Sequence, residues 1–346
     1  MILLKMFLLP ISLLYGVVVW FRNKCFDWRL FKSESFDVPL ISVGNISVGG
    51  TGKTPHVEYI IRLLKEFSSK GILSRGYGRK TKGFQSVVAD SKAIQVGDEP
   101  LQYAQKFQDV SVVVHEDRVQ GIKKLTNEGV GLIILDDAFQ HRWVQPGFNI
   151  LLTTYNNLYI DDFLIPVGKL REGKMSALRA DVIVVTKAPK ALLPVDKNRL
   201  VEQIAPWPHQ QLCFSYYDYS HPVNVFTKEE VPLEEQQILL LTGIADAQSI
   251  KDYLIGKVEV VDHLEYKDHH LYSSKDVEKI VEKWKEVKSS KKLILTTEKD
   301  AVRLQEFKEE MQNISICYLP VKVRFHEGEK FNNLVLSYVR ENTRNS

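Results

Sequence analysis

The stretch from Ser42 to Pro55, SVGNISVGGTGKTP, places four glycines and a lysine–threonine pair directly behind an apolar run. Where glycines relax the backbone, successive N–H groups can turn inward around an anion, and a helix that begins near Lys53 directs its positive end at the same point. In this interpretation Lys53 neutralises the β- and γ-phosphates of a nucleotide, and Thr54 binds Mg²⁺. The predicted nucleotide-binding residues are Ser47, Val48, Gly49, Gly50, Thr51, Gly52, Lys53 and Thr54.

The strict phosphate-loop pattern, G-x-x-x-x-G-K-[ST], is broken at its first position, where this chain has Ser47. The structural alternative is a glycine-rich turn between a strand and a helix that binds nothing. The apolar run LISV directly before the loop, followed by GTGKT, favours the phosphate site.

A second motif, VGLIILDDAFQHR over residues 130–142, supplies carboxylates. Four apolar residues run into Asp136 and Asp137, and the C-terminal end of a parallel strand is where open α/β sheets bind ligands. One of these aspartates is expected to hold Mg²⁺, directly or through water, unless the two only cap a loop. Together the two motifs predict a nucleoside triphosphate. GTP is disfavoured because the segment TKAP, residues 186–189, lacks the aspartate of a guanine-reading N/T-K-x-D motif.

A kinase must also hold an acceptor hydroxyl and a group that takes its proton. The candidates are Asp98, in VGDEP, and the cluster DHLEYKDHH over residues 262–270. From the residues alone the alternative is a membrane-associated P-loop ATPase that acts on a protein partner, with Asp98 positioning water instead of an alcohol.

From Val38 onward, short β-branched runs alternate with amphipathic segments, a pattern typical of parallel strands joined by helices. A stretch rich in Pro and aromatic residues around 206–208 separates this series from a second one. The sequence predicts an α/β fold with a P-loop NTPase-like parallel-sheet domain over residues 26–205, a second, smaller α/β domain over residues 206–346 that closes over the active-site cleft, and an N-terminal apolar helix over residues 1–25.

The expected strands of the first series cover residues 40–43, 71–73, 110–114, 132–135, 150–153 and 182–185, with helices over 54–68, 99–107 and 118–127. The second series is expected to contribute strands over 238–241, 258–261, 293–296 and 314–318.

The segment Met6 to Phe21 is almost entirely apolar, and Arg22 and Lys24 follow it at once. A buried core helix, an anchor embedded at the membrane surface and a true span are all compatible with this composition. Lys5 and the proline at residue 10 interrupt the stretch needed for a span. Aromatic and basic residues at one end favour the anchor at a cytoplasmic membrane face, where cations meet anionic headgroups.

Bulk composition adds little. The formal net charge of +3 is too small to indicate a nucleic-acid partner, and no protein partner is implied. The three cysteines, Cys25, Cys213 and Cys317, form no CxxC pair and predict neither a disulfide framework nor a zinc site.

Seven motifs occur in the order found in the tetraacyldisaccharide 4'-kinase (lipid A 4'-kinase) family, which this chain resembles over nearly its whole length. They are GNISVGGTGKTP, SRGYGR, GDEP, DDAFQHR, PVGKLRE, KDHHLY and TTEKDAV. The resemblance implies transfer of the γ-phosphate of ATP, with Mg²⁺, to the 4'-hydroxyl of a tetraacylated glucosamine disaccharide 1-phosphate, giving lipid IVA. It also implies a location at the cytoplasmic face of the bacterial inner membrane.

The resemblance further implies that one histidine of the KDHHLY segment pairs with Asp98 across the interdomain cleft, and His269 is chosen over His270. It places Arg171 and Glu172 near the nucleotide or the metal, with a surface ion pair as the alternative. The family usually has glycine where this chain has Ala138, which would matter if that position required a positive φ.

The acceptor carries a phosphate, so cations should lie near the cleft. Arg75 and Arg118 are the candidate phosphate ligands, because arginine pairs with phosphate bidentately. Tyr77 could stack on the sugar. The alternative for all three is an ordinary structural or solvated role.

Overall fold

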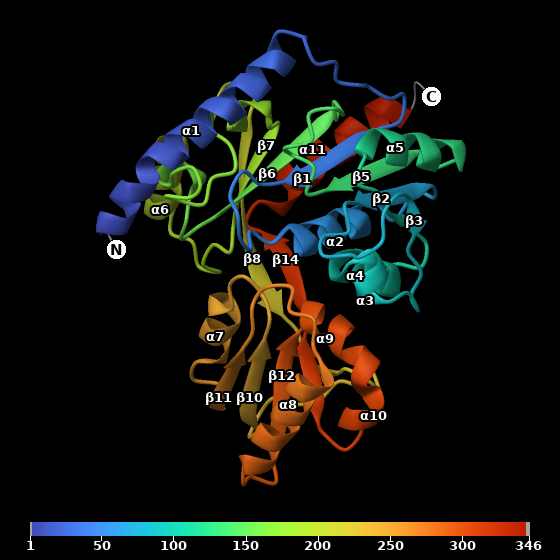
Figure 1. The fold of residues 1–346 in the computed structure, drawn as a ribbon, viewed down its shortest axis with the longest axis vertical. Helices are drawn as coiled ribbons and strands as arrows, with labels where there is room; N and C mark the ends of the chain where they lie inside the picture. Colours follow the sequence, from blue (N-terminus) through green and yellow to red (C-terminus); the bar gives the residue numbers. More distant parts are fainter. Residues whose placement is uncertain (1, 344–346) are drawn as a thin grey trace.

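Within residues 2–343, which the structure describes with side chains from residue 7 onward, a sheet of nine strands and a sheet of five organise the chain (Figure 1). The structure is a computed structural model. The larger sheet carries the N-terminal half of the chain, and the smaller sheet lies beyond one end of it.

The larger sheet has the strand order β14-β8-β7-β6-β1-β5-β2-β4-β3. Its strands are parallel except at the two edges, where β14 pairs with β8 and β3 pairs with β4 in antiparallel fashion. The strands are β1 (Leu40–Gly44), β2 (Lys70–Ser74), β3 (Gln85–Ser86), β4 (Ser111–Val114), β5 (Leu132–Asp136), β6 (Phe148–Thr154), β7 (Val182–Thr186), β8 (Gln211–Tyr219) and β14 (Val321–Phe325).

Alternate residues of these strands face opposite layers, as the two-residue period of a strand requires. Ile41, Ile72 and Ile134 belong to a core beneath one set of helices, whereas Leu40 and Leu135 belong to a second core on the other face. Both faces are therefore apolar, which is typical of a parallel sheet covered on both sides. The packing explains why these strands read as continuous hydrophobic runs.

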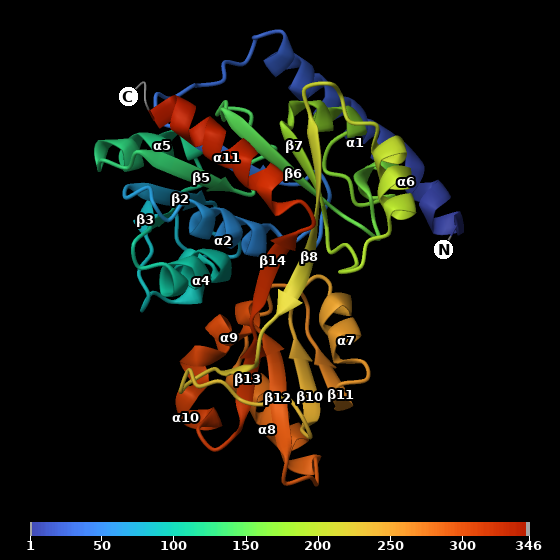
Figure 2. The same ribbon diagram turned by 180° about the vertical axis from the view of Figure 1, so that it is seen from behind.

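Helices cover both faces of the larger sheet (Figures 1 and 2). One face packs against α2 (Lys53–Leu63), α4 (Asp98–Lys106) and α11 (Gly328–Thr343). The opposite face packs against α5 (Arg118–Asn127) and α6 (Pro194–Ile204). Short helical segments complete this part: α3 (Ala93–Val96), η1 (Tyr159–Asp161) and η2 (Lys174–Arg179).

The smaller sheet has the order β11-β10-β12-β13-β9 and is parallel except for the β13–β9 pair. Its strands are β9 (Val223–Asn224), β10 (Gln237–Thr242), β11 (Glu259–Glu265), β12 (Lys292–Thr297) and β13 (Ile316–Leu319). Its helical segments are α7 (Gln248–Leu254), α8 (Ser274–Glu286), α9 (Glu298–Leu304), η3 (Gln305–Phe307) and α10 (Lys308–Met311).

Strands β8 and β14 run from the larger sheet to the smaller unit side by side and are the two chain connections between them (Figure 2). Residues 211–219 and 321–343, which the sequence analysis placed in the second domain, thus pair and pack with the larger sheet. The reason is that β14 returns to pair with a strand about a hundred residues earlier. Because strands β9 to β13 form the smaller sheet, we infer that the second unit comprises about residues 220–320.

Helix α1 (Ile2–Asp27) lies along the outside of the larger unit, next to β7 and α6 (Figure 1). It is held by polar contacts: Ser12 Oγ donates to the Leu164 carbonyl at 2.8 Å, and Tyr15 Oη donates to the Arg171 carbonyl at 2.7 Å. Its outer side exposes apolar side chains, among them Phe7, Leu13, Leu14, Val17 and Val18. No helix in the described part of the chain is long and apolar enough to cross a membrane.

The three cysteines are buried and unpaired.

Phe331 of α11 provides a test of the packing of the returning C-terminal segment. Its ring is 1 % exposed and stacks on Phe325 at 4.0 Å between centroids, inside the core of the larger sheet. We expect Phe331→Ala to lower the free energy of unfolding by about 3–5 kcal/mol, because truncation leaves a cavity. Urea denaturation measures the change, and exposed Lys322→Ala is the control, expected to stay within about 0.5 kcal/mol of the parent. Equal stabilities of the two variants would contradict this packing.

Candidate active site

The glycine-rich loop lies between β1 and α2 and is fixed from both sides. Asn45 Nδ2 donates to Thr51 Oγ1 at 2.8 Å, and Thr186 Oγ1 donates to the Thr51 carbonyl at 2.9 Å. Gly52 precedes the first residue of α2 with φ +87°, and a Cβ there would lie 2.3 Å from Tyr217 Oη. Only glycine suits this position, so the loop reaches the helix N-terminus in one defined conformation.

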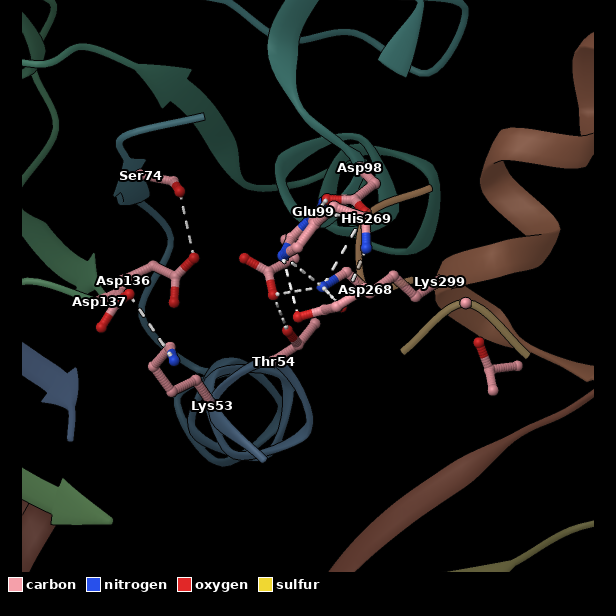
Figure 3. Close-up of polar contacts among 12 residues, drawn as sticks. Lys53, Thr54, Ser74, Asp98, Glu99, Asp136, Asp137, Asp268, His269 and Lys299 are labelled. Carbon is pink, nitrogen blue, oxygen red and sulfur yellow. Dashed lines mark hydrogen bonds and ion pairs between the residues drawn. The ribbon is translucent and has the colours of Figure 1, made fainter. Parts of the chain in front are cut away.

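Lys53 is the first residue of α2, and its ammonium group points at the end of the neighbouring strand (Figure 3). The register that pairs Val43 with Asp136 brings the ends of β1 and β5 together. Lys53 Nζ lies 3.7 Å from Asp137 Oδ2, and Arg171 contacts both oxygens of the same carboxylate, at 3.1 and 3.3 Å. Burial opposes ionisation of Asp137, but Lys53 and then Arg171 lower its pKa.

Asp136 has the opposite electrostatic environment. Its side chain is buried, one oxygen accepts a hydrogen bond from Ser74 Oγ at 3.2 Å, and Oδ1 has no hydrogen-bond partner. Burial, with the nearby carboxylates of Glu99 and Asp137, raises the pKa of Asp136 to about 7. A buried acceptor without a donor, next to other carboxylates, is a place where a cation would be stabilised.

No group of three or more His, Cys, Asp or Glu side chains among the described residues is arranged to hold a metal ion unaided. Mg²⁺ commonly takes one or two protein carboxylates and completes its shell with water and substrate phosphates. The donor set of Thr54, Asp136 and Asp137 matches that habit.

Asp98 faces His269 across the junction of the two units (Figure 3). Asp98 is the first residue of α4 in the larger unit and is 5 % exposed, whereas His269 lies in the loop between β11 and α8. Its Nδ1 is 3.1 and 3.2 Å from the two carboxylate oxygens of Asp98. Burial raises the pKa of Asp98, but Lys299, His269 and Arg303 outweigh burial and lower it well below the usual range.

His270 takes no part in that contact. Its Nε2 lies 3.1 Å from Asp276 Oδ2, the carboxylate that forms the capping box of α8 with Ser273. Its ring packs against Tyr266 and Tyr272. The arrangement assigns His270 to the N-terminus of a helix and leaves His269 to face Asp98.

Lys53, Asp137 and His269 line one cleft of about 500 Å³ between the units, and Asp98 contacts the cleft residue His269. Residues from both sheets line it, including Val48–Pro55, Tyr77, Glu99, Asp137, Arg171, Lys187, Tyr217, Asp246, Asp268, His269 and Lys299. The glycine-rich loop, Lys53, the carboxylate of Asp137 and the histidine of the Asp98–His269 pair thus share a single opening. The arrangement suits transfer of a phosphoryl group to an alcohol.

Comparison with known proteins agrees with this geometry. Residues 4–340 match the family model of LpxK, tetraacyldisaccharide-1-P 4'-kinase. The chain belongs to this family. A tetraacyldisaccharide 4'-kinase from Phocaeicola vulgatus is 44 % identical, with 98 % of this chain and 96 % of the relative covered. One from Flavobacterium johnsoniae is 43 % identical, with 98 % of each covered.

A solved structure of LpxK from Aquifex aeolicus, described as in complex with ATP, superimposes with a TM-score of 0.76. It is 32 % identical in sequence and covers 97 % of this chain and 99 % of its own length. The predicted resemblance to the 4'-kinase family and the predicted α/β fold are therefore confirmed.

The 4'-kinase motifs do not all reach the cleft. Arg171 does, but Glu172, its neighbour in PVGKLRE, is 1 % exposed and points toward α1. There its carboxylate binds Arg179 and lies 3.7 Å from Arg22 Nη2 and 3.4 Å from Asn23 Nδ2. This contact attaches the N-terminal helix to the larger unit.

The predicted acceptor residues also differ in exposure. Tyr77 is 65 % exposed and its ring lies 4.7 Å from that of His269, and Arg75 is exposed on the same loop. Arg118 is 3 % exposed and donates to the carbonyls of His115, at 2.7 Å, and Asp136, at 3.2 Å. Burial lowers the pKa of Arg118 to about 10.

Ala138, the departure from the family's glycine, adopts an ordinary backbone conformation. The positive φ of this loop belongs to Asp137, at +46°, and the methyl group of Ala138 packs in the core. The substitution therefore causes no backbone strain.

Sequence reasoning gave no role to Glu99, Lys299 or Arg303. Thr54 Oγ1 donates to Glu99 Oε1 at 3.3 Å, and Arg303 Nε lies 3.5 Å from Asp98 Oδ2. Lys299 and Arg303 lie on α9, which begins in the TTEKDAV motif. The TTEKDAV motif could have drawn attention to this helix, but nothing in its sequence indicates that Lys299 or Arg303 contacts α4.

Arg118 provides a test of the buried cation. We expect Arg118→Ala to lower the free energy of unfolding by about 1–3 kcal/mol, because two carbonyl acceptors lose a buried donor. Chemical denaturation measures this loss. Arg75→Ala is the matched control, since its side chain is exposed, and should change stability by less than about 0.5 kcal/mol. A similar small effect for both variants would contradict the structural role of Arg118.

Proposed function

We infer that the chain is an ATP-dependent kinase that phosphorylates the 4'-hydroxyl of tetraacyldisaccharide 1-phosphate in lipid A biosynthesis. The observation that carries this inference is the Asp98–His269 pair, whose histidine lines the same cleft as the phosphate loop. We infer the substrate from the name of the relatives, tetraacyldisaccharide 4'-kinase. Membership over nearly the whole chain does not favour the alternative, an ATPase acting on a protein partner.

For the nucleotide, we propose that the loop from Ser47 to Thr54 cradles the phosphates of ATP. The ATP-bound LpxK from Aquifex aeolicus supports this choice of ligand. Lys53 neutralises the β- and γ-phosphates, and its contact with Asp137 keeps it aimed at them in the free protein. Arg171 completes the positive side of the site through the same carboxylate.

For the metal, Thr54, Asp136 and Asp137 would hold Mg²⁺. Two observations support this choice: Oδ1 of Asp136 has no hydrogen-bond partner, and burial together with the carboxylates of Glu99 and Asp137 raises the pKa of Asp136, so a cation there would stabilise its ionised form. When bound, the ion neutralises charge on the phosphates and helps align them.

For the acceptor, Asp98 accepts a hydrogen bond from the 4'-hydroxyl and receives its proton. A carboxylate of lowered pKa stays ionised at neutral pH but is a weak base. Its contribution is thus mainly to align the hydroxyl, which suits a loose transfer that requires little early deprotonation. His269 orients the carboxylate. Arg75 and Tyr77, both exposed on one loop, are the proposed contacts to the acceptor, whereas Arg118 is buried and donates to the carbonyls of His115 and Asp136.

For the location, we propose that the exposed apolar side of α1 embeds in the cytoplasmic face of the inner membrane. Each methylene of an acyl chain that left the bilayer for water would cost about 0.8 kcal/mol, so four chains must stay in lipid while the headgroup enters the cleft. Phe7, Leu14 and Val18, each at least 60 % exposed, provide the apolar contact.

The assignment of Asp98 is tested with γ-labelled ATP and a detergent-dispersed disaccharide lipid. The parent protein should place label on the lipid. Asp98→Asn, which keeps the shape of the side chain, should lower turnover by about 10²- to 10⁴-fold because the hydroxyl loses its proton acceptor. ATP binding, measured by calorimetry, should persist.

His270→Ala is the control for this experiment, since His270 binds Asp276 instead of Asp98. It should keep most of the turnover. Release of free phosphate by the parent, with no labelled lipid, would support the ATPase alternative. If Asp98→Asn turned over nearly as fast as the parent protein, Asp98 would not be the group that accepts the proton of the 4'-hydroxyl.

The membrane proposal is tested with Leu14→Asp/Val18→Asp. We expect this variant to sediment less with anionic vesicles and to phosphorylate bilayer-embedded acceptor more slowly, because two exposed apolar contacts become charged. ATP binding should not change. Ile255→Asp, at an exposed apolar position of the smaller unit, is the matched control. Unchanged sedimentation and turnover of the α1 variant would show that the helix does not anchor the protein.

A further inference from the structure

Lys299 lies on α9, and its ammonium group is surrounded by three acceptors (Figure 3). Nζ lies 3.0 Å from His269 Nε2, 3.2 Å from Glu99 Oε1 and 3.5 Å from Asp268 Oδ1. A lysine ammonium has N–H donors and no acceptor, so it donates hydrogen bonds to His269 and Glu99 and forms an ion pair with Asp268. The side chain is 16 % exposed, so water competes little for these bonds.

The direction of the Lys299–His269 bond determines the tautomer of the histidine. Because Lys299 can only donate, Nε2 of His269 must offer a lone pair. The ring proton is then on Nδ1, the atom that faces the two oxygens of Asp98 at 3.1 and 3.2 Å. In this tautomer the Nδ1–H group donates to the carboxylate of Asp98.

We propose that Lys299 is a positioning residue, which fixes His269 as the Nδ1–H tautomer and keeps Asp98 ionised for the transfer reaction. The inference rests on the proposed kinase function and goes beyond it in assigning a role to the lysine of TTEKDAV. Lys299 acts through His269 and Asp98.

Lys299 is one of two cations that lie close to the carboxylate of Asp98. From α9, Lys299 Nζ and Arg303 Nε lie 3.9 and 3.5 Å from Asp98 Oδ2. The loop before α8 contributes His269 and the opposing carboxylate of Asp268, and α4 contributes Glu99. Without Lys299, one cation remains beside two additional carboxylates. The pKa of Asp98 should then rise.

Lys299 also joins the two units. Glu99, on α4, accepts bonds from both Lys299 and Thr54 of the phosphate loop. His269 and Asp268 belong to the smaller unit, as Lys299 does. A continuous path of hydrogen bonds therefore leads from the nucleotide loop to Asp98, and it is complete only when the units meet.

The kinetic test uses Lys299→Met. We expect kcat to fall roughly 10- to 100-fold, the size found when a partner that orients a functional histidine is removed. The KM for ATP should change little. The acid limb of kcat/KM should move toward higher pH, since Asp98 loses an opposite charge within 4 Å and protonates more readily.

Two variants serve as controls. Lys299→Arg retains the charge, so its acid limb should stay near that of the parent while kcat falls less. Gln305→Ala removes a contact between the units, its hydrogen bond with Gln105, without touching Asp98 or His269, and should leave the pH profile unchanged. The proposal would be overturned if Lys299→Met had the kcat and the acid limb of the parent protein. It would also be overturned if Gln305→Ala shifted the acid limb as much as Lys299→Met does.

A second measurement does not depend on catalysis. Nitrogen-15 NMR of the histidine-labelled parent protein, with the His269 signal assigned by His269→Asn, reports the tautomer directly. At pH 7.5 we expect protonated Nδ1 and unprotonated Nε2. An Nε2–H ring or an imidazolium would overturn the proposal. Failure of the parent to phosphorylate the lipid would instead reject the proposed function and leave this tautomer result standing.

Discussion

The contact between Asp98 and His269 is the interaction on which the active site depends, because its two partners belong to different units of the molecule. A phosphate loop and its acidic neighbours can hold a nucleotide within the larger sheet alone. Transfer to an alcohol requires a correctly aligned proton acceptor, and the residues that orient Asp98 come from the loop before α8 and from α9. We propose that Asp98 is correctly oriented only when the two units are in contact, much as a lid completes a catalytic site.

The balance of charge in the cleft follows from the same arrangement. Near the end of β5, burial and the carboxylates of Glu99 and Asp137 raise the pKa of Asp136, and one of its buried oxygens has no donor. At Asp98 the effect is opposite, because Lys299, His269 and Arg303 lower the pKa of the carboxyl group. One region suits a bound cation, and the other keeps a carboxylate ionised without one. The two requirements are met within a single opening because Glu99 contacts both regions.

Much of this could be predicted from the sequence, where local pattern determines structure. The parallel strands of the larger sheet read as apolar runs because helices cover both faces. The motifs predicted a phosphate loop and singled out Asp136, Asp137 and Asp98, whose roles stay predictions. The expected helix over residues 54–68 was too long, since α2 ends at Leu63. The expected helix over 118–127 matches α5.

The remaining features depend on contacts between distant segments. Strand β14 pairs antiparallel with β8, and no local pattern indicates that residues 321–343 return to the larger sheet. Arg118 and Glu172 look like exposed charges in sequence, but the fold buries both. Lys299 lies two hundred residues from Glu99, so its role could not be read from TTEKDAV.

A double-mutant cycle on Asp98→Asn and His269→Asn tests whether these two side chains act as one unit, with turnover on the lipid acceptor as readout. If the pair acts as a unit, the double variant should lose little more than Asp98→Asn alone, a coupling of about 1–3 kcal/mol; strictly additive losses would contradict the account.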